Sequence, residues 1–418
     1  MANGTGHKIL THAAIGVLPD WEQKLLAPVR AKLETEYSMY GDAYFINPSE
    51  IGPYIELPDG RLPMDPWEIR HFRKDGPGDD YYTCGYYDLM RYSFEYFAEE
   101  CIKCIECNDL TSFAKFTGSI AHIIQDCGTP AHAVGTTMST DMKMIKLLYP
   151  APDIKKMVCQ LHFVLENTFK PFSLKYKPKL LGCTPSEISF NLLERFTDML
   201  EFSISFINPI LAAFYKDDHE GVAELLTECG QYPSKVLADF IHSVIAVGMG
   251  QLDSNEQDKL KNATLSEYTP SERSAWAPAP YQYAEIRKSP WGLNDQYEPV
   301  PLTLLIDGKE KIFKKGFGIG PPYQITYLLP KNVYKQFNST IGIHSKLGTE
   351  SGVTFKVLGD GIELTRGQCN TINDTLIINC NIANVHKLTL EITPSGDIPC
   401  PSNSHAIWGK PQLLKNNR

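Results

Sequence analysis

The most informative stretch in the first half of the chain is Gly118-Ser119-Ile120-Ala121-His122-Ile123-Ile124-Gln125-Asp126-Cys127-Gly128-Thr129-Pro130-Ala131-His132. It ends a run with helical periodicity, so His122 and Asp126, four residues apart, face one spot on the same side of a helix. Gly128 and Pro130 break the helix, and the turn can bring His132 back toward that spot. Zinc favours such a mixed nitrogen and oxygen ligand set. The spacing therefore favours a metal site over a capped helix end with two core histidines.

A second imidazole–carboxylate pair lies further along the chain. His162 and Glu166 are again four residues apart, on an amphipathic run over residues 154–169. A single pair of this kind is usually a surface ion pair on a helix. Together with the first cluster, however, the pair predicts ligands for a second metal ion.

The order and spacing of these residues resemble the bacterial zinc-dependent phospholipase C family, whose site holds three zinc ions. His-x3-Asp-x5-His followed by His-x3-Glu is central to that family's pattern, and three further residues extend it toward the start of the chain. His7 resembles the family's first histidine, Asp42 lies where the family has an aspartate ligand, and His71 resembles the histidine of a His-Phe pair. The resemblance covers the first half of the chain and implies an all-helical domain.

The resemblance also implies which residues bind each ion. It assigns His71, His122, Asp42 and Asp126 to the first zinc, His132, His162 and Glu166 to the second, and His7 and Asp126 with the amino terminus to the third. In such a site, clustered zinc ions clamp the phosphoryl oxygens and activate a water molecule that attacks phosphorus. Catalysis is expected to depend on Asp42 and Glu166, with Asp42 acting as ligand, general base or both.

Two positions bear on the substrate. Zinc-dependent single-strand nucleases share the first motif but end the ligand set with His-x3-Asp, whereas this chain has Glu166. The glutamate favours the phospholipase branch and leaves the nuclease as the alternative. The phospholipases carry a phenylalanine of a choline pocket where this chain has Glu68, beside Trp67. Glu68 could attract a cationic head group, and Trp67 offers a cation–π face.

Composition limits the remaining classes of function. The 418 residues carry a formal net charge of −9, which argues against broad attraction to nucleic acid, so we expect no duplex nucleic-acid partner. No run reaches the ~20 apolar residues of a transmembrane segment. The polar start of the chain, Met1–Gly6, does not resemble a signal peptide. The chain as given is therefore expected in the cytoplasm, or outside the cell if a precursor was trimmed.

Periodicity places the helices and strands, with a change of pattern between them. Helices are predicted over residues 13–18, 21–33, 86–105, 111–126, 154–169, 185–208, 209–215, 221–228 and 233–247, with long loops over 40–71 and 136–152. Residues 253–283 are polar and proline-containing, as in a linker. Short strands with period-two alternation are predicted over residues 302–306, 312–315, 323–328, 340–343, 352–358, 362–365, 375–378 and 387–392. That spacing is typical of a β-sandwich.

Several stretches of this second half resemble the NPCBM family, a carbohydrate-binding sandwich appended to glycan-active enzymes. The matching stretches are Lys315–Gly320, Val353–Gly361, Leu388–Ile392 and His405–Trp408. The resemblance implies a glycan ligand for this half. Trp291, Tyr323 and Trp408 could stack on sugars, although an aromatic side chain in a sandwich is more often part of the core.

The sequence thus predicts a multidomain α + β protein. An all-α phospholipase C-like domain is expected over residues 1–252, a linker over 253–283, and an antiparallel, jelly-roll-like β-sandwich over 284–418. The predicted function is a zinc-dependent phosphodiesterase that hydrolyses glycerophospholipids to diacylglycerol and a phosphorylated head group, with an accessory glycan-binding module. A zinc-dependent single-strand nuclease and a non-catalytic glycan-binding protein with structural zinc are the alternatives.

Overall fold

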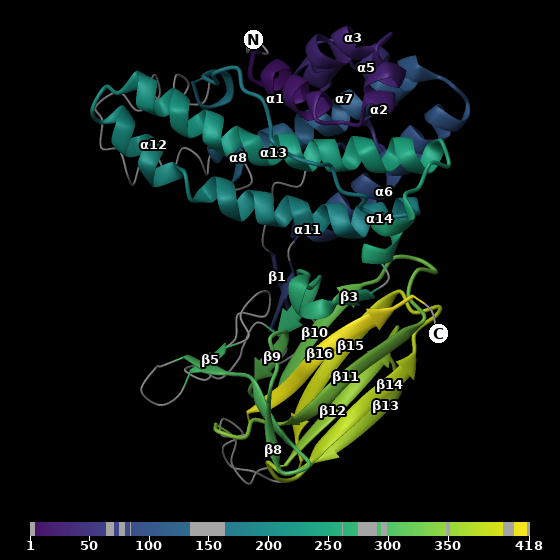
Figure 1. Ribbon diagram of the computed structural model, residues 1–418, viewed down its shortest axis with the longest axis vertical. Coiled ribbons are helices and arrows are strands. Elements are labelled where there is room, and N and C mark those ends of the chain that lie inside the picture. The colour runs from purple at the N-terminus through teal and green to yellow at the C-terminus, as the bar shows by residue number, and fades with distance from the viewer. Residues whose placement is uncertain are drawn as a thin grey trace. The chain divides into compact units, whose positions relative to one another are not determined.

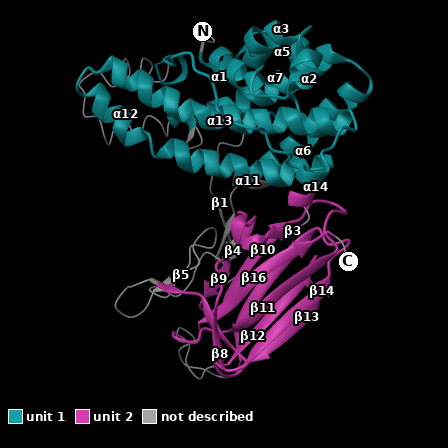
Figure 2. Ribbon diagram, in the orientation of Figure 1, with its two compact units in different colours: residues 1–69, 85–257 teal, residues 70–84, 258–418 magenta. Residues whose placement is uncertain are grey.

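The chain forms two compact units. The computed structural model describes residues 5–63, 71–74, 80–83, 85–133, 164–260, 262–274, 291–293, 299–347, 352–395 and 405–415. The first unit comprises residues 1–69 and 85–257, and the second comprises residues 70–84 and 258–418 (Figure 2). Each unit has a buried apolar core of its own.

The described part of the first unit is helical (Figure 1). Its helices are α1 (Thr5–Gly16), α2 (Asp20–Leu26), α3 (Arg30–Thr35), the 3-10 helix η1 (Tyr37–Met39), α4 (Tyr40–Tyr44), α5 (Pro48–Ile55), α6 (Gly85–Glu106), α7 (Leu110–Cys127), α8 (Pro130–Ala133), α11 (Pro185–Ile204), α12 (Ile207–Phe214), α13 (His219–Gly248) and α14 (Ser254–Lys259). The helical fold predicted for the first half is therefore confirmed. Within the described ranges, none of the helices combines the length and the apolar character that crossing a membrane requires.

Helix α7 is the central element of this unit. Asp109 caps its first turn by accepting a hydrogen bond from the backbone N–H of Ser112 (3.0 Å). Beyond that turn nearly every side chain is buried, and the helix packs against α1, α6 and α13. It ends at Cys127, and Gly128 and Pro130 lead into α8, as the sequence predicts. The stretch that carries the predicted ligands therefore lies on a rigid, buried element.

Helix α13 is longer than the sequence predicts. Pro233 suggested a break between two helices, yet one helix runs from His219 to Gly248. Proline removes one backbone hydrogen bond, but the apolar side chains that follow it are buried, and their packing outweighs that local cost. A β-carbon on Gly128 would lie 2.5 Å from the Cβ of Pro233. The proline therefore packs directly against the turn that follows α7.

The long loop predicted over residues 40–71 contains two short helices, α4 and α5. Pro48 occupies the first turn of α5, where its missing N–H costs nothing. Ile51 and Ile55, one turn apart, are buried and fix this helix to the core. The packing of α4 against α5 and α7 places Asp42 beside the helix that carries His122.

The second unit is built from antiparallel strands. They are β1 (His71–Lys74), β2 (Asp80–Thr83), β3 (Asn262–Thr264), β4 (Glu272–Ser274), β5 (Trp291–Leu293), β6 (Pro299–Pro301), β7 (Thr303–Ile306), β8 (Lys309–Ile312), β9 (Gly316–Ile319), β10 (Tyr323–Leu328), β11 (Gln336–Ile343), β12 (Val353–Gly359), β13 (Ile362–Cys369), β14 (Thr375–Asn381), β15 (Lys387–Pro394) and β16 (Ala406–Leu414). One sheet has the order β1-β2-β4-β10-β15-β12-β13, and the other has the order β14-β11-β16-β3 with β9 also paired to β16. The predicted antiparallel sandwich is confirmed.

The core of the sandwich contains two of the three aromatic residues that the sequence offers for sugar stacking, Trp408 and Tyr323. Trp408 is 1% exposed and packs edge-on against Phe337 and Phe355, with ring centroids 6.1 and 5.2 Å away. Tyr323 is also buried. Both residues are core residues, and only the backbone of Trp291 is described.

Some short strands of this unit lie where the sequence predicts none. The predicted linker contains β3 and β4, which pair with β16 and β10. Strands β1 and β2 come from the first half of the chain and join the seven-stranded sheet where β2 pairs with β4. Strands of three or four residues carry too little alternation to be recognised, and their pairing partners are distant in sequence.

Candidate functional site

His122 lies near the end of α7, and the backbone fixes its ring. Its Nδ1–H donates a hydrogen bond to the carbonyl oxygen of Ser38 in η1 (2.9 Å). Gly41 lies against the ring, since a β-carbon there would be 2.1 Å from Cδ2 and 2.5 Å from Nε2 of His122. Because a carbonyl oxygen only accepts hydrogen bonds, the bond to Ser38 leaves the lone pair of the neutral imidazole on Nε2.

His7 on α1 is held in the same way. Its Nδ1–H donates to Oε1 of Gln125 (2.8 Å), whose Nε2 donates to Oγ1 of Thr11 (2.7 Å). With Oε1 of Gln125 facing His7, Nδ1 of this imidazole carries the proton and the lone pair is on Nε2. The rings of His7 and His122 stack, with centroids 4.3 Å apart and 18° between their planes.

Asp126 lies between the two imidazoles. Its Oδ1 is 3.4 Å from Nε2 of His7, and its Oδ2 is 3.2 Å from Nε2 of His122. The buried Nε2 of His122 has no hydrogen-bond partner among the described residues. Two lone pairs that face a carboxylate repel it unless a cation lies among them, either a proton or a metal ion.

The pKa values of His122 and of Asp126 also indicate that the site favours a positive charge. Burial disfavours the imidazolium of His122, but the carboxylate of Asp126 outweighs burial and raises the pKa of His122 to about 9. Burial is the largest cause that lowers the pKa of His7, and the charge of the neighbouring His122 lowers it further. Burial opposes ionisation of Asp126, yet the imidazoles of His122 and His132 hold its pKa below the usual range. The site therefore combines an ionised carboxylate with imidazoles, as a cation site requires.

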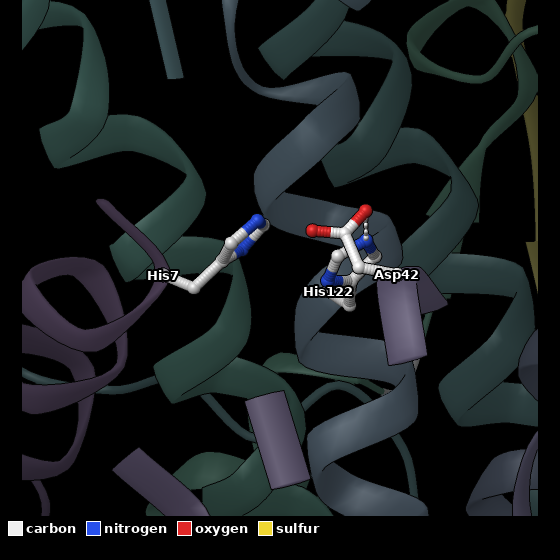
Figure 3. A group of neighbouring side chains, drawn as sticks. All are labelled: His7, Asp42 and His122. Atoms are coloured by element: carbon white, nitrogen blue, oxygen red, sulfur yellow. Dashed lines mark ion pairs between the residues drawn. The ribbon is translucent and has the colours of Figure 1, made fainter. Parts of the chain in front are cut away.

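Asp42 on α4 completes the first group of candidate ligands (Figure 3). Its Oδ1 lies 3.8 Å from Nε2 of His122, and one ligand atom each of His7, Asp42 and His122 lie within 4.8 Å of one another. The side chain of Asp42 is 51% exposed, whereas that of His122 is 1% exposed. The group is thus buried on the histidine side and open to solvent on the aspartate side.

A second group shares the Asp126 carboxylate. Ligand atoms of Asp126, His132 and Glu166 also lie within 4.8 Å of one another. Nε2 of His132 is 2.7 Å from Oε1 of Glu166, which lies in a helical turn over residues 164–167. A β-carbon on Gly6 would be 1.9 Å from the carbonyl oxygen of Glu166. The glycine before His7 therefore lets α1 approach the turn that carries Glu166.

The structure brings together most of the predicted ligands, namely His7, Asp42, His122, Asp126, His132 and Glu166. His71 lies on β1, a strand of the second unit, and only its backbone is described. His162, Trp67 and Glu68 lie outside the described residues. The roles assigned to these residues stay predictions.

Three residues that position the site were not predicted from the sequence: Ser38, Gly41 and Gln125. Gln125 directly precedes Asp126 inside the motif, and Gly41 directly precedes Asp42, so their positions in the sequence offered a signal. Ser38 acts through its carbonyl oxygen, which any residue provides. For that contact the sequence carries no signal.

The fold and the site define a helical unit with a candidate multinuclear metal centre, followed by an antiparallel β-sandwich. Residues 273–414 match the family model of the NPCBM/NEW2 domain. No curated protein matches the sequence.

Several solved structures are similar to this chain. The alpha toxin from Clostridium absonum is 11% identical with a TM-score of 0.37, and the match covers 100% of this chain and 96% of that one. CBM51 from Clostridium perfringens GH95, solved in complex with methyl-galactose, is 18% identical with a TM-score of 0.30, over 37% of this chain and 99% of that one. The M60 catalytic domain with the CBM51-1 and CBM51-2 domains of Clostridium perfringens ZmpB is 24% identical with a TM-score of 0.30, over 37% of this chain. The match covers 15% of that protein.

Proposed function

We propose that the helical unit is a zinc-dependent phosphoric diester hydrolase of the phospholipase C type, which hydrolyses glycerophospholipids to diacylglycerol and a phosphorylated head group. Asp126 carries the proposal. Its two oxygens face Nε2 of His7 and Nε2 of His122, and it also belongs to a group with two further candidate ligands. A carboxylate shared by two such groups suits neighbouring metal ions, and the family resemblance implies three.

Zinc fits this donor set better than calcium or magnesium does. Those ions prefer oxygen ligands alone, whereas zinc takes imidazole nitrogen together with carboxylate oxygen. Both described imidazoles of the first group donate Nδ1–H to a neighbouring acceptor, His122 to Ser38 and His7 to Gln125. Metal-binding histidines make this kind of outer hydrogen bond. In this proposal His162 adds a further ligand to the set.

The residues of the chain have separate tasks in this proposal. Bound zinc supplies Lewis acidity and lowers the pKa of a bound water toward ~7. Ser38 and Gln125 accept the Nδ1–H of the two imidazoles, so Nε2 is the nitrogen of each ring that faces the site and can bind an ion. Asp42 is the exposed member of the cluster, so it meets solvent and substrate, either as a ligand or as the acceptor of the proton from water.

The second unit is proposed to bind a glycan. The match of residues 273–414 to the NPCBM/NEW2 domain supports this role. A similar structure, CBM51 from Clostridium perfringens GH95, was solved with methyl-galactose, so we take galactosides as the first ligands to test. Trp408 and Tyr323 are buried, so aromatic contacts to a sugar would come from other residues.

Phosphorus NMR tests the activity directly. The zinc-loaded protein is incubated with phosphatidylcholine, phosphatidylethanolamine and single-stranded oligonucleotides, with a chelator as the control. Phosphocholine or phosphoethanolamine signals that the chelator abolishes would support the proposal and identify the head group. Nucleotide monophosphates would instead assign the protein to the nuclease alternative, and the absence of all these products would contradict a phospholipase C activity.

Glu166→Gln separates catalytic zinc from structural zinc. If the site is catalytic, turnover falls by about 10- to 100-fold while the melting temperature is kept, because one ligand of the site is weakened. If zinc is structural only, the variant unfolds and the parent protein shows no turnover. Glu228→Gln, at an exposed glutamate on α13, is the matched control and should change neither quantity.

A further inference from the structure

An exposed apolar pair lies next to Asp42 on the surface of the first unit. Phe45 and Ile46 are 77% and 71% exposed, more than any other large apolar side chain described in that unit. They follow α4 directly, and the N–H of Ile46 still donates to the carbonyl oxygen of Ala43 (3.0 Å), so the helical turn continues through them. Positions three and four residues after Asp42 lie on the side of the helix that carries it.

The neighbouring residues hold this pair in place. The hydroxyl of Tyr44 donates to Oε1 of Glu56 (2.7 Å), which ties α4 to α5. The ring of Phe45 meets the ring of Tyr44 edge-on, with centroids 5.6 Å apart. Ile51 and Ile55 anchor α5 in the core. The exposure of the pair is therefore built into the packing of α4 and α5.

The charges around the pair select the kind of surface that it can meet. Residues 40–61 contain the acidic residues Asp42, Glu50, Glu56 and Asp59 and a single basic residue, Arg61, which pairs with Asp59 (2.6 Å) and leaves the other three acids in excess. An anionic surface would be repelled, whereas the cationic group of a choline or ethanolamine lipid would be attracted. Exposed apolar side chains with acidic neighbours therefore match a zwitterionic membrane surface.

We propose that Phe45 and Ile46 form an interfacial anchor, which inserts into the surface of a zwitterionic phospholipid membrane next to the candidate site. This inference rests on the proposed function, because a lipid substrate requires the enzyme to meet a membrane surface. It deepens that function by naming the physical form of the substrate, an assembled choline or ethanolamine lipid. Removal of both apolar side chains weakens membrane binding about tenfold or more, because each contributes its transfer from water.

Vesicle sedimentation with the full-length protein tests the anchor without relying on turnover. The double variant Phe45→Ser/Ile46→Ser is expected to bind phosphatidylcholine vesicles about tenfold more weakly than the parent. Ile204→Ser, at an exposed isoleucine that ends α11 in the same unit, is the control and should bind as the parent does. Equal binding by the double variant, no binding by the parent, or tighter binding to phosphatidylglycerol vesicles would each overturn the proposal.

Turnover distinguishes failure of the anchor from failure of the proposed function. The double variant should lose much more activity on phosphatidylcholine vesicles than on a dissolved short-chain phosphatidylcholine. If the parent hydrolyses neither lipid but binds vesicles through Phe45 and Ile46, the proposed function fails and the anchor stands. If the double variant matches the parent on vesicles, the anchor fails and the proposed function stands.

Discussion

Two imidazoles of the candidate site are oriented by residues that do not face the site. Ser38 and Gln125 each accept an Nδ1–H, from His122 and His7, and so determine which nitrogen can bind a cation. A free imidazole exchanges between two tautomers and rotates about its side-chain bonds. In His7 and His122 the tautomer and the ring orientation are fixed before an ion arrives. Zinc binding therefore loses less conformational entropy.

Gln125→Met tests this orientation. Methionine has a similar length and stays buried, but it removes the acceptor for Nδ1–H of His7. We expect zinc affinity to fall by about 10- to 100-fold, measured by competition with a fluorescent chelator. Gln251→Met, at an exposed position after α13, is the control and should keep the parental affinity. Equal affinities for both variants would show that Gln125 does not orient His7.

His242, a buried histidine of α13, makes the stability of the helical unit depend on pH. Nδ1 of His242 lies 2.6 Å from Oε1 of Glu22, and its Nε2 lies 3.2 Å from Oε2 of Glu256. Burial acts to lower the pKa of His242, but the bonds to the carboxylates of Glu22 and Glu256 outweigh it and raise the pKa above 6.5. The folded protein therefore holds this proton more tightly than the unfolded chain does.

The stability that this proton contributes is complete below pH 6.5 and is lost as pH rises through the raised pKa of His242. We expect the melting temperature of the zinc-free protein to fall on the alkaline side of pH 6.5. His242→Gln should flatten that slope, and His219→Gln, at an exposed histidine of the same helix, should keep it. Thermal unfolding across this pH range is the measurement, and a parental slope in His242→Gln would contradict the assignment.

The sequence predicts the ligand residues better than it predicts their neighbours. His122, Asp126 and His132 lie within one short stretch, so helical spacing alone brings the first two together. His7 and Asp42 were assigned through the ordered pattern of a known family, because nothing local connects them to that stretch. The outer hydrogen bonds come from chain segments that only tertiary packing brings near, so spacing could not predict them.

At the level of elements, the close approach of α4 and α7 depends on Gly41. A β-carbon at this position would lie 2.1 Å from the His122 ring, so Gly41→Ala must displace either the ring or α4. We expect weaker zinc binding and a loss of about 1–3 kcal/mol in the free energy of unfolding, measured by chelator competition and denaturant titration. Gly16→Ala, where nothing lies within 4 Å of the added carbon, is the matched control. Loss of zinc binding in both variants would contradict this role for Gly41.

Some elements follow from the local sequence pattern alone, whereas in others tertiary packing overrides that pattern. Glycine and aspartate are typical turn residues, and in the turn Gly359-Asp360-Gly361 between β12 and β13 Asp360 and Gly361 adopt the left-handed conformation that a tight hairpin needs. The sequence predicts a new helix beginning at Pro233, but the buried apolar residues on both sides of it keep α13 continuous. The local preference of glycine and aspartate determines the conformation of the exposed turn. The burial of apolar side chains determines that α13 stays continuous.

At the level of the whole molecule, zinc should stabilise one unit and not the other. The candidate ligands described together all lie in the first unit, and an ion that binds only the folded state raises the stability of the unit that binds it. Calorimetry of the full-length protein should therefore show two unfolding transitions, of which a chelator lowers only one. A chelator that moves both transitions equally, or neither, would contradict a zinc site confined to the helical unit.

The division of the chain also bears on how such a protein could evolve. Because β1 and β2 come from residues 70–84, the second unit is not one continuous segment of the gene. A single recombination event near residue 257 would carry most of the sandwich to a new host protein but leave these two strands behind. Strand β4 would then become an unpaired edge, which invites pairing with other chains. A lineage that exchanged this module would therefore have to replace or shield that edge in the same step, which favours inheritance of the two units together.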